Sequence, residues 1–195
     1  MGRRSDHTRD ELRTMIIHEG HRQLSQAGFA RFSAREVAKQ IGYSIGTIYN
    51  VFGTYDQLML AINGHTLDLW RACLEARLAG RIENRLAEAI AAYFDFATHH
   101  RHAWTALYDF RLPEGETPPP DYTARVMAIT DVVVREVAAA LPPARADEAP
   151  ALARSLLATV HGHCFFALNG TFRLLGESDP LAAALARVHD AVKPR

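Results

Sequence analysis

The chain has 195 residues, of which 48% are hydrophobic, and its 22 basic side chains balance 22 acidic ones. This composition excludes a disordered protein, and the length allows one or two domains with a substantial core. No apolar run reaches the roughly 18 residues of a membrane span, and residues 1–13 are too polar for a signal peptide. Cys73 and Cys164 lack a CxxC partner, so we expect reduced thiols, no membrane association and a cytoplasmic location.

The first helix is marked by a capping signal near the N-terminus. Thr8 and Glu11 have the spacing of a capping box, and Gly28 follows Ala27 as a stop. A helix is therefore expected from Thr8 to Ala27. Its buried stripe would comprise Leu12, Met15, Ile16 and Leu24.

Residues 33–58 contain three helix starts in close succession. Ser33 with Glu36 predicts a capping box, and Gly42 ends the short helix that follows. Ser44 can cap a second short helix over Ile45–Phe52. Two short helices joined by a glycine turn indicate a helix-turn-helix, whose second helix can enter the DNA major groove. The alternative is an ordinary corner of a helical protein.

The rest of the chain also has helical spacing, without strand-like alternation. Thr54 with Gln57 predicts the start of a helix running from Tyr55 to about Ala79. Proline-rich breaks separate the later helices, which are expected at about residues 83–98, 100–110, 122–141, 147–170 and 180–192. We predict an all-α protein of about nine helices. A three-helix head, residues 1–54, would precede a helical bundle, residues 55–195.

Charge is unevenly distributed along the chain. Residues 1–55 contain eight basic and five acidic side chains, which leaves a net charge of +3 there and −3 over the rest. A basic head on an acidic body is expected if only the head touches DNA. Arg3 and Arg4 lie in an N-terminal arm that either reaches DNA phosphates or is a frayed terminus.

The residues of the head also carry a family resemblance. They include Gly28-Phe29, Ser33, Arg35, Val37-Ala38, Ile41-Gly42, Ser44, Gly46-Thr47, Tyr49, Phe52 and Leu58. The segment from about Arg13 to Ala61 resembles the DNA-binding domain of TetR transcriptional regulators, most specifically in S-x-G-T-I-Y-x-x-F. The family usually has a lysine where Tyr55 stands, so this phosphate contact would lack a charge.

The resemblance and the helical spacing together suggest which side chains meet DNA. The resemblance places Thr47 and Tyr49 on phosphates, whereas Ser44, Ile45 and Asn50 lie where they can reach base edges. The expected DNA-contacting residues are Arg35, Ser44, Ile45, Thr47, Tyr49, Asn50 and Tyr55. Ile48 and Phe52 are expected in the core. One head reads few bases, so a homodimer on a palindromic operator is implied.

The second half resembles the C-terminal domain of one TetR branch, whose hallmark is an early Trp and a later His-Gly pair. The matching residues are His102, Trp104, Leu107, Phe110, Pro113 and Val160-His161-Gly162. The resemblance implies small-molecule binding and dimerisation. A second copy, the protein's own core, or both would cover the apolar stripes at Leu156, Val160, Cys164, Ala167 and Leu168, and at Leu181, Leu185 and Val188.

Aromatic side chains are abundant in the expected bundle, where they form either core or an apolar pocket. They are Trp70, Tyr93, Phe94, Phe96, Trp104, Tyr108, Phe110, Phe165 and Phe166. The candidate ligand-binding residues are Trp104, Tyr108, Met127, His161 and Phe165. Their mixture of apolar surface with one hydroxyl and one imidazole suits a hydrophobic, weakly polar effector.

These features predict a ligand-responsive transcriptional regulator, most simply a repressor released from its operator by a small hydrophobic effector. No metal, other cofactor or catalytic residue is expected, because the histidines lack the spacing of a ligand set. One alternative is an enzyme that uses His161 as a base, although no nucleophile accompanies it. Another is a helical interaction protein without a DNA role.

Overall fold

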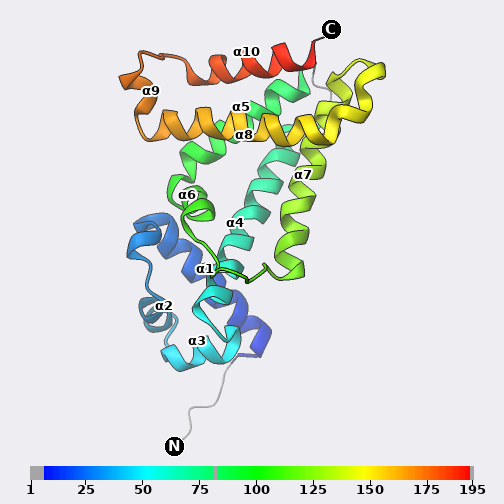
Figure 1. Ribbon diagram of the computed structural model, residues 1–195. Coiled ribbons are helices and arrows are strands. Elements are labelled where there is room, and N and C mark those ends of the chain that lie inside the picture. The colour runs from blue at the N-terminus through cyan, green and yellow to red at the C-terminus, as the bar shows by residue number, and fades with distance from the viewer. Residues whose placement is uncertain (1–6, 81–82, 194–195) are drawn as a thin grey trace, which may run out of the picture. The chain divides into compact units, whose positions relative to one another are not determined.

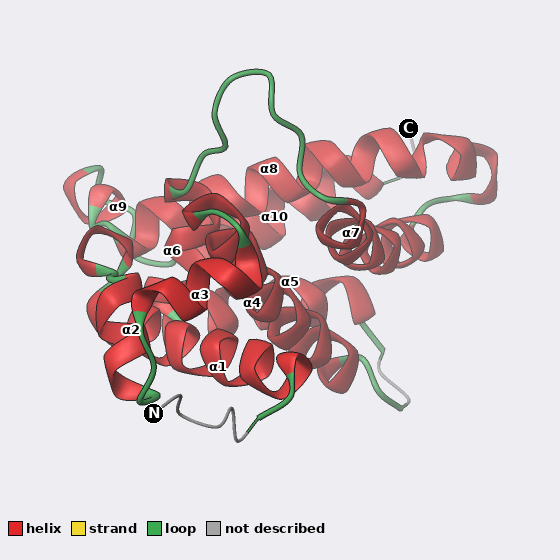
Figure 2. Ribbon diagram, turned by 90° about the horizontal axis from the view of Figure 1, so that it is seen from below, coloured by secondary structure: helices red, strands yellow, loops and turns green. Residues whose placement is uncertain are grey.

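The computed structural model describes residues 7–80 and 83–193. The described residues contain helices and loops and no strand, which confirms the all-α expectation (Figure 2). The α-helices are α1 (Arg9–Ala27), α2 (Ala34–Gln40), α3 (Ile45–Phe52), α4 (Tyr55–Arg77), α5 (Arg85–His99), α6 (Arg101–Asp109), α7 (Pro120–Ala140), α8 (Ala149–Leu168), α9 (Thr171–Leu174) and α10 (Pro180–Val192). Two 3-10 helices are η1 (Phe29–Arg31) and η2 (Pro143–Glu148). Arg3 and Arg4 lie outside the described residues.

The chain forms two compact units that do not follow the order of the sequence. The first unit combines Met1–Leu69 with His100–Arg125, and the second combines Trp70–His99 with Val126–Arg195. Helices α4 and α7 each continue from one unit into the other, and α6 belongs to the first. Packing therefore joins α6 to the head, whereas the functional boundary after residue 54 stays a prediction.

Local side-chain caps fix where α1 and α2 begin. The Thr8 hydroxyl accepts from the Glu11 backbone N–H at 3.3 Å, and the Glu11 carboxylate accepts from the Thr8 N–H at 2.7 Å. This confirms the first capping box. The Ser33 hydroxyl likewise accepts from the Glu36 N–H at 3.4 Å, but the Ser33 N–H donates to the Gln23 side chain at 2.8 Å. The reciprocal half of the second box is therefore wrong, because α1 supplies the acceptor.

The turn between α2 and α3 has a geometry that requires glycine. Gly42 has a φ of 77°, the left-handed region in which a side chain would be strained. The Tyr43 N–H donates to the Ala38 carbonyl at 2.9 Å, and the Gly42 N–H donates to that of Lys39 at 3.2 Å. This pair of bonds is a Schellman motif, which satisfies the last carbonyls of α2. The chain is thereby turned sharply into α3.

The core of the first unit is built from α1 to α4 and α6. Its buried apolar side chains include Leu12, Ile16, Leu24, Val37, Ala38, Ile48, Phe52, Leu58, Met59, Ile62, Ala106 and Phe110. The expectation that Ile48 and Phe52 face the core is confirmed. Helix α4 crosses α1 at Gly20, where an added Cβ would lie 2.5 Å from the Ile62 Cδ1. Burial of these side chains holds the short helices in place, since helices of this length are marginal alone.

The second unit contains α5, α8, α9 and α10 with parts of α4 and α7. Helices α8 and α10 lie side by side and are connected through α9 (Figure 1). Leu156, Val160, Cys164 and Val188 are buried in this unit, so that part of the apolar stripes covers the protein's own core. Other large apolar side chains are exposed, namely Phe165, Phe166, Leu174 and Leu175.

One stretch, Pro143–Leu168, is long and apolar enough to cross a membrane by length and composition alone, with a hydropathy of 1.2. Only 22% of that window is buried within the structure. A single helix of this kind is weak evidence for a membrane span.

Candidate nucleic-acid interface and effector cavity

Helix α3 presents a polar face to solvent and an apolar face to the core. Tyr49 retains 40% of its exposure and Asn50 and Ser44 are exposed, whereas Ile45 and Thr47 are partly buried. The same helix buries Ile48 and Phe52. The 3.6-residue period therefore places the expected base-reading and phosphate-contacting side chains on the solvent side. An exposed helix of this kind fits the major groove.

Ser44 has a structural role as well as its expected DNA contact. Its hydroxyl accepts from the Thr47 N–H at 3.2 Å and lies 3.1 Å from the Thr47 hydroxyl. Both side chains therefore order the first turn of α3 before any DNA is present. A pre-ordered helix start lowers the entropy cost of binding.

Positive charge near α3 comes from its neighbours, because Ile45–Phe52 contains no charged residue. Arg35 is exposed on α2, where it can donate to a phosphate. On α1, the Arg9 guanidinium donates to the Val51 carbonyl at 3.5 Å. The guanidinium carbon of Arg13 lies 4.9 Å from the centre of the Phe52 ring, a cation–π distance. These contacts place two cations at the end of α3.

Tyr55 lies at the start of α4, directly after the α3 helix and its glycine turn. Its ring is 36% exposed, and its centre lies 6.2 Å from that of Phe32. Burial raises the pKa of its phenol, so the side chain stays neutral. Tyr55 can therefore give a phosphate a hydrogen bond but not a charge.

Three imidazoles cluster where α1 meets α4 in the first unit. The rings of His18 and His65 stack with their centres 5.0 Å apart, and His21 meets His65 edge-on at 4.8 Å. Burial, followed by the neighbouring imidazoles, lowers the pKa of His21 to about 4. Among the described residues no group of His, Cys, Asp or Glu side chains is placed to hold a metal ion. His21 is therefore uncharged at neutral pH within this packed set of rings.

The five residues expected to bind ligand are divided between the units. Trp104 and Tyr108 belong to the first unit, where their ring centres lie 5.3 Å apart. His161, Phe165 and Met127 belong to the second. The His161 and Phe165 rings stack at 6.1 Å, and Met127 is 51% exposed. Their contact with an effector stays a prediction.

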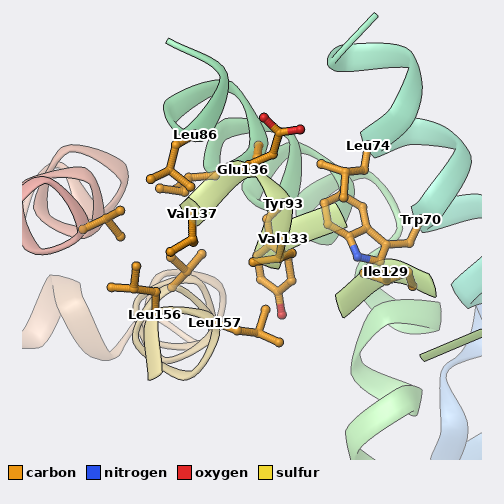
Figure 3. A pocket seen from close by; sticks show the side chains of 14 residues that line it. Trp70, Leu74, Leu86, Tyr93, Ile129, Val133, Glu136, Val137, Leu156 and Leu157 are labelled. Atoms are coloured by element: carbon orange, nitrogen blue, oxygen red, sulfur yellow. The ribbon is translucent and has the colours of Figure 1, made fainter. Parts of the chain in front are cut away.

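The second unit has an apolar cavity of its own, with a volume of about 50 Å³. Side chains from α4, α5, α7 and α8 point toward one another around it (Figure 3). Its lining residues are Trp70, Leu74, Leu86, Ala89, Ile90, Tyr93, Ile129, Val133, Glu136, Val137, Leu156, Leu157, Val160 and Val188. None of the five expected ligand residues lines it. Trp70 and Tyr93 belong to the aromatic set noted in the sequence, but the aliphatic lining carries no signal that distinguishes it from ordinary core.

Two polar groups meet this apolar lining. The Tyr93 hydroxyl lies 2.9 Å from the His161 Nδ1, so His161 reaches the cavity only through Tyr93. Glu136 is 3% exposed, and its carboxylate accepts from Arg85 at 2.8 and 3.0 Å and from Arg135 at 3.4 Å. The Arg85 bond is the main cause that lowers the pKa of Glu136, so the carboxylate stays ionised and compensated. The cavity therefore favours apolar groups over cations.

The first unit's paired short helices, tight glycine turn and exposed polar face define a helix-turn-helix DNA-binding protein. Residues 16–62 match the family model described as bacterial regulatory proteins, tetR family. Residues 86–189 match the tetracyclin repressor-like C-terminal domain.

Known proteins extend this match. The chain is 29% identical over 160 residues to the HTH-type transcriptional regulator BetI of Burkholderia thailandensis, covering 79% of this chain and 80% of that one. A Rhodococcus sp. RHA1 protein of unknown function has a similar fold, with a TM-score of 0.74, 21% identity and full coverage of both chains. BioQ, solved with its double-stranded DNA operator, has a TM-score of 0.59, 16% identity and coverage of 91% of this chain and 98% of that chain.

The chain belongs to the TetR family of DNA-binding transcriptional regulators. It is a regulator and not an enzyme, in agreement with the family and its relatives. The structural likenesses, at 21% and 16% identity, show the fold alone.

Proposed function

We propose that this protein is a homodimeric repressor that leaves a palindromic operator when a small hydrophobic effector binds its second unit. The proposal rests on the presence of two different kinds of candidate site in the two units of one chain. An exposed, pre-capped recognition helix lies in the first compact unit, and an apolar cavity lies in the second. Such a protein acts in the cytoplasm, where its operator is.

On the DNA side, residues 1–54 form the reading head. Asn50 suits bidentate contact with adenine, and Ser44 and Ile45, at the start of α3, can also reach base edges. Arg35, Thr47, Tyr49 and Tyr55 then supply phosphate contacts, only the first of which carries charge. One head covers a single half-site, so genomic specificity requires two heads on an inverted repeat.

Dimerisation through the second unit is supported by its bare apolar surface. Phe165 and Phe166 on α8 retain 41% and 40% of their exposure, and Leu174 and Leu175 retain 85% and 67%. Exposed apolar side chains gathered on neighbouring elements mark interaction sites in soluble proteins. A second copy of the same face is the simplest cover, because a two-fold interface uses one patch twice.

Coupling between effector and DNA would pass through the three places where the chain crosses between units. These are the middle of α4 at residues 69–70, the junction of α5 and α6 at residues 99–100, and α7 at residues 125–126. Within the first unit, α6 is tied to α1 by a 3.0 Å bond between the His102 Nδ1 and the Ser25 carbonyl. The buried Asn63 amide of α4 also donates to the Ala106 carbonyl of α6 at 3.3 Å. A ligand that prefers one arrangement of the second unit can therefore shift the protein toward conformations in which the DNA-binding heads no longer fit the operator.

The experiment is operator binding by the full-length protein, measured by fluorescence anisotropy over a range of salt concentrations. Arg35→Ala is expected to weaken binding and to reduce the salt slope by about one, because one phosphate contact is lost. Tyr49→Ala is expected to weaken binding with less effect on the slope. Arg154→Ala, an exposed arginine on α8, is the matched control and should behave as wild type.

If Arg35→Ala and Tyr49→Ala bind DNA as tightly as Arg154→Ala, α3 is not the reader and the proposal fails. Effector action has its own requirement. Operator DNA and effector must weaken each other's binding by the same factor, so equal effector affinity with and without operator would contradict release.

A further inference from the structure

The apolar cavity of the second unit is continuous in its lining with a larger open recess. The recess has a volume of about 560 Å³ and lies between the first turns of α5, the end of α7 and α10. Leu86, Ile90 and Val188 line both spaces. We call the apolar 50 Å³ space the chamber and the larger 560 Å³ space the mouth. These three side chains therefore form the passage between them.

The mouth differs from the chamber in its chemistry. Three of its lining residues, Asn84, His189 and Lys193, are polar, and none of its described lining residues is acidic. The Lys193 ammonium donates to the Asp190 carboxylate at 2.9 Å, a pair that is exposed on both sides. Exposed pairs of this kind contribute little in water, so a ligand anion can replace the carboxylate. The mouth therefore favours a polar or anionic group.

The end of α10 is held in place by a largely buried arginine. The Arg145 side chain is 11% exposed and pairs with Glu148 at 2.9 Å. Its guanidinium also donates to the Lys193 carbonyl at 2.8 Å and to that of Ala191 at 3.2 Å. This tie fixes the backbone that carries Lys193 at the rim of the mouth.

We propose that the effector is an amphipathic carboxylate, with an unbranched apolar tail in the chamber and its anionic head at Asn84, His189 and Lys193. It enters between α5 and α10, past Leu86, Ile90 and Val188. This assignment rests on the proposed function, in which the second unit binds the effector, and adds the class of molecule and its orientation. The compensated Glu136 at the chamber edge favours an apolar tail over a cationic one.

The chamber volume limits the tail. About 10–15 Å³ of such volume holds one water-sized group, so the chamber accommodates roughly four methylene-sized groups, with further carbons in the mouth. Each methylene removed from water should tighten binding about fourfold until the space is full. Affinity is therefore expected to rise steeply along a short-chain series and then level off.

The experiment titrates the full-length protein with straight-chain carboxylates of roughly four to twelve carbons, and with the matched primary alcohols, by calorimetry. A Trp104→Phe protein leaves Trp70, which lines the chamber, as the sole tryptophan. Its fluorescence is expected to shift on binding of the longer carboxylates, which locates the tail.

Two variants test the binding of the apolar tail and of the carboxylate group separately. Leu86→Trp should block the passage and abolish the dependence on chain length, with a melting curve to check that it folds. Lys193→Gln should weaken carboxylate binding about threefold to fivefold and leave alcohol binding unchanged. Arg173→Gln, an exposed charge on α9 outside the mouth, is the matched control and should bind both series as wild type.

The proposal is overturned if carboxylates bind no better than alcohols, if Trp70 does not respond, or if Lys193→Gln behaves as Arg173→Gln. Operator binding is measured on the same samples. A protein that binds an operator but no carboxylate refutes the effector class and leaves the regulator standing. A protein that binds carboxylates at Trp70 but no operator refutes the regulator instead.

Discussion

The two units of this protein use apolar surface in opposite ways. In the first unit the apolar side chains of α3 are buried, Ile48 to 0% and Phe52 to 7%, and polar groups such as Asn50 remain outside. In the second unit apolar side chains line a chamber, and others, led by Leu174 at 85%, are left bare. A surface that reads DNA needs fixed polar groups on a small rigid core. A surface that binds an effector and a second copy needs unfilled apolar area.

Removing a buried side chain from the recognition helix should have the largest effect. Ile48→Ala is expected to lower the free energy of unfolding by about 2–5 kcal/mol, because it deletes fully buried methyl groups and leaves a cavity. Denaturant titration measures it. A loss below about 0.5 kcal/mol, the usual range for a surface change, would show that α3 is not anchored through this residue.

Substitutions in the exposed apolar surface of the second unit should change self-association and leave folding stability unchanged. Changing both Leu174→Asp and Leu175→Asp is expected to weaken self-association by at least about tenfold, because each subunit would bring new charges into an apolar contact. Analytical ultracentrifugation measures the dimer constant. The paired change Ala182→Asp with Ala186→Asp, on the exposed side of α10, tests whether that helix shares the interface. An unchanged constant in both proteins would place the interface elsewhere.

Acid is expected to destabilise the first unit through His21. The pKa of His21 is lowered to about 4, mainly by burial and then by His65, His100 and His18, so the unfolded chain binds its proton first. Stability due to neutral His21 is complete above about pH 6.5 and is lost as the pH falls toward about 4. We expect a loss of roughly 1–2 kcal/mol, after discounting for the partly solvated ring.

Thermal melts at a series of pH values test this expectation. His21→Leu should flatten the pH dependence between about pH 6.5 and 4, whereas His99→Gln, an exposed imidazole in the second unit, should not. Identical profiles for wild type and His21→Leu would mean that this ring does not sense acid. Burial and the charge of His18 also lower the pKa of His65, and Asp68 opposes this lowering.

The cap of the recognition helix should have a smaller effect. Ser44→Ala is expected to cost about 1 kcal/mol of stability and Ser44→Gly only a few tenths, since glycine is itself tolerated at an N-cap. Chemical unfolding of both variants beside Ser178→Ala, an exposed serine between α9 and α10, gives the comparison. Equal losses for the two Ser44 variants would argue against the cap as the cause.

The smallest expected change concerns Tyr55. Tyr55→Lys should steepen the salt dependence of operator binding by about one in slope, because it adds a charge where the ring is expected to approach DNA. Tyr108→Lys, at a tyrosine of similar exposure on α6, should leave the slope unchanged. If both variants behave alike, Tyr55 does not approach a phosphate.

The difference between local contacts and contacts made by tertiary packing explains which features could be predicted from the sequence. Thr8 with Glu11, and Ser44 with Thr47, interact over three residues, so the starts of α1 and α3 follow from local spacing. Gln23, in contrast, reaches Ser33 across ten residues, and no spacing rule predicts that partner. Contacts within one helical turn therefore set the helix starts of the head. The predicted bond between the Glu36 side chain and the Ser33 N–H was wrong because tertiary packing brings Gln23 to that N–H.

The second unit was less predictable for a related reason. Leu86, Val137 and Leu156 read as ordinary core residues, and only packing leaves a space between them. The short α9 helix was missed because Gly170 reads as a stop, although there it precedes another turn. Glu136 carried no sequence signal of burial, because its compensation by Arg85 depends on a partner 51 residues away.

The most direct measurement of the central claim is selection of bound sequences from random DNA by the purified full-length protein, followed by the stoichiometry of the selected site. We expect an inverted repeat whose half-sites are separated by about one helical turn or more, bound by two chains. Tyr49→Ala is expected to enrich the same site more weakly under the same conditions, because a phosphate contact is lost and the base-reading side chains remain. Enrichment of an asymmetric site bound by one chain, or equal enrichment by Tyr49→Ala, would contradict the central claim.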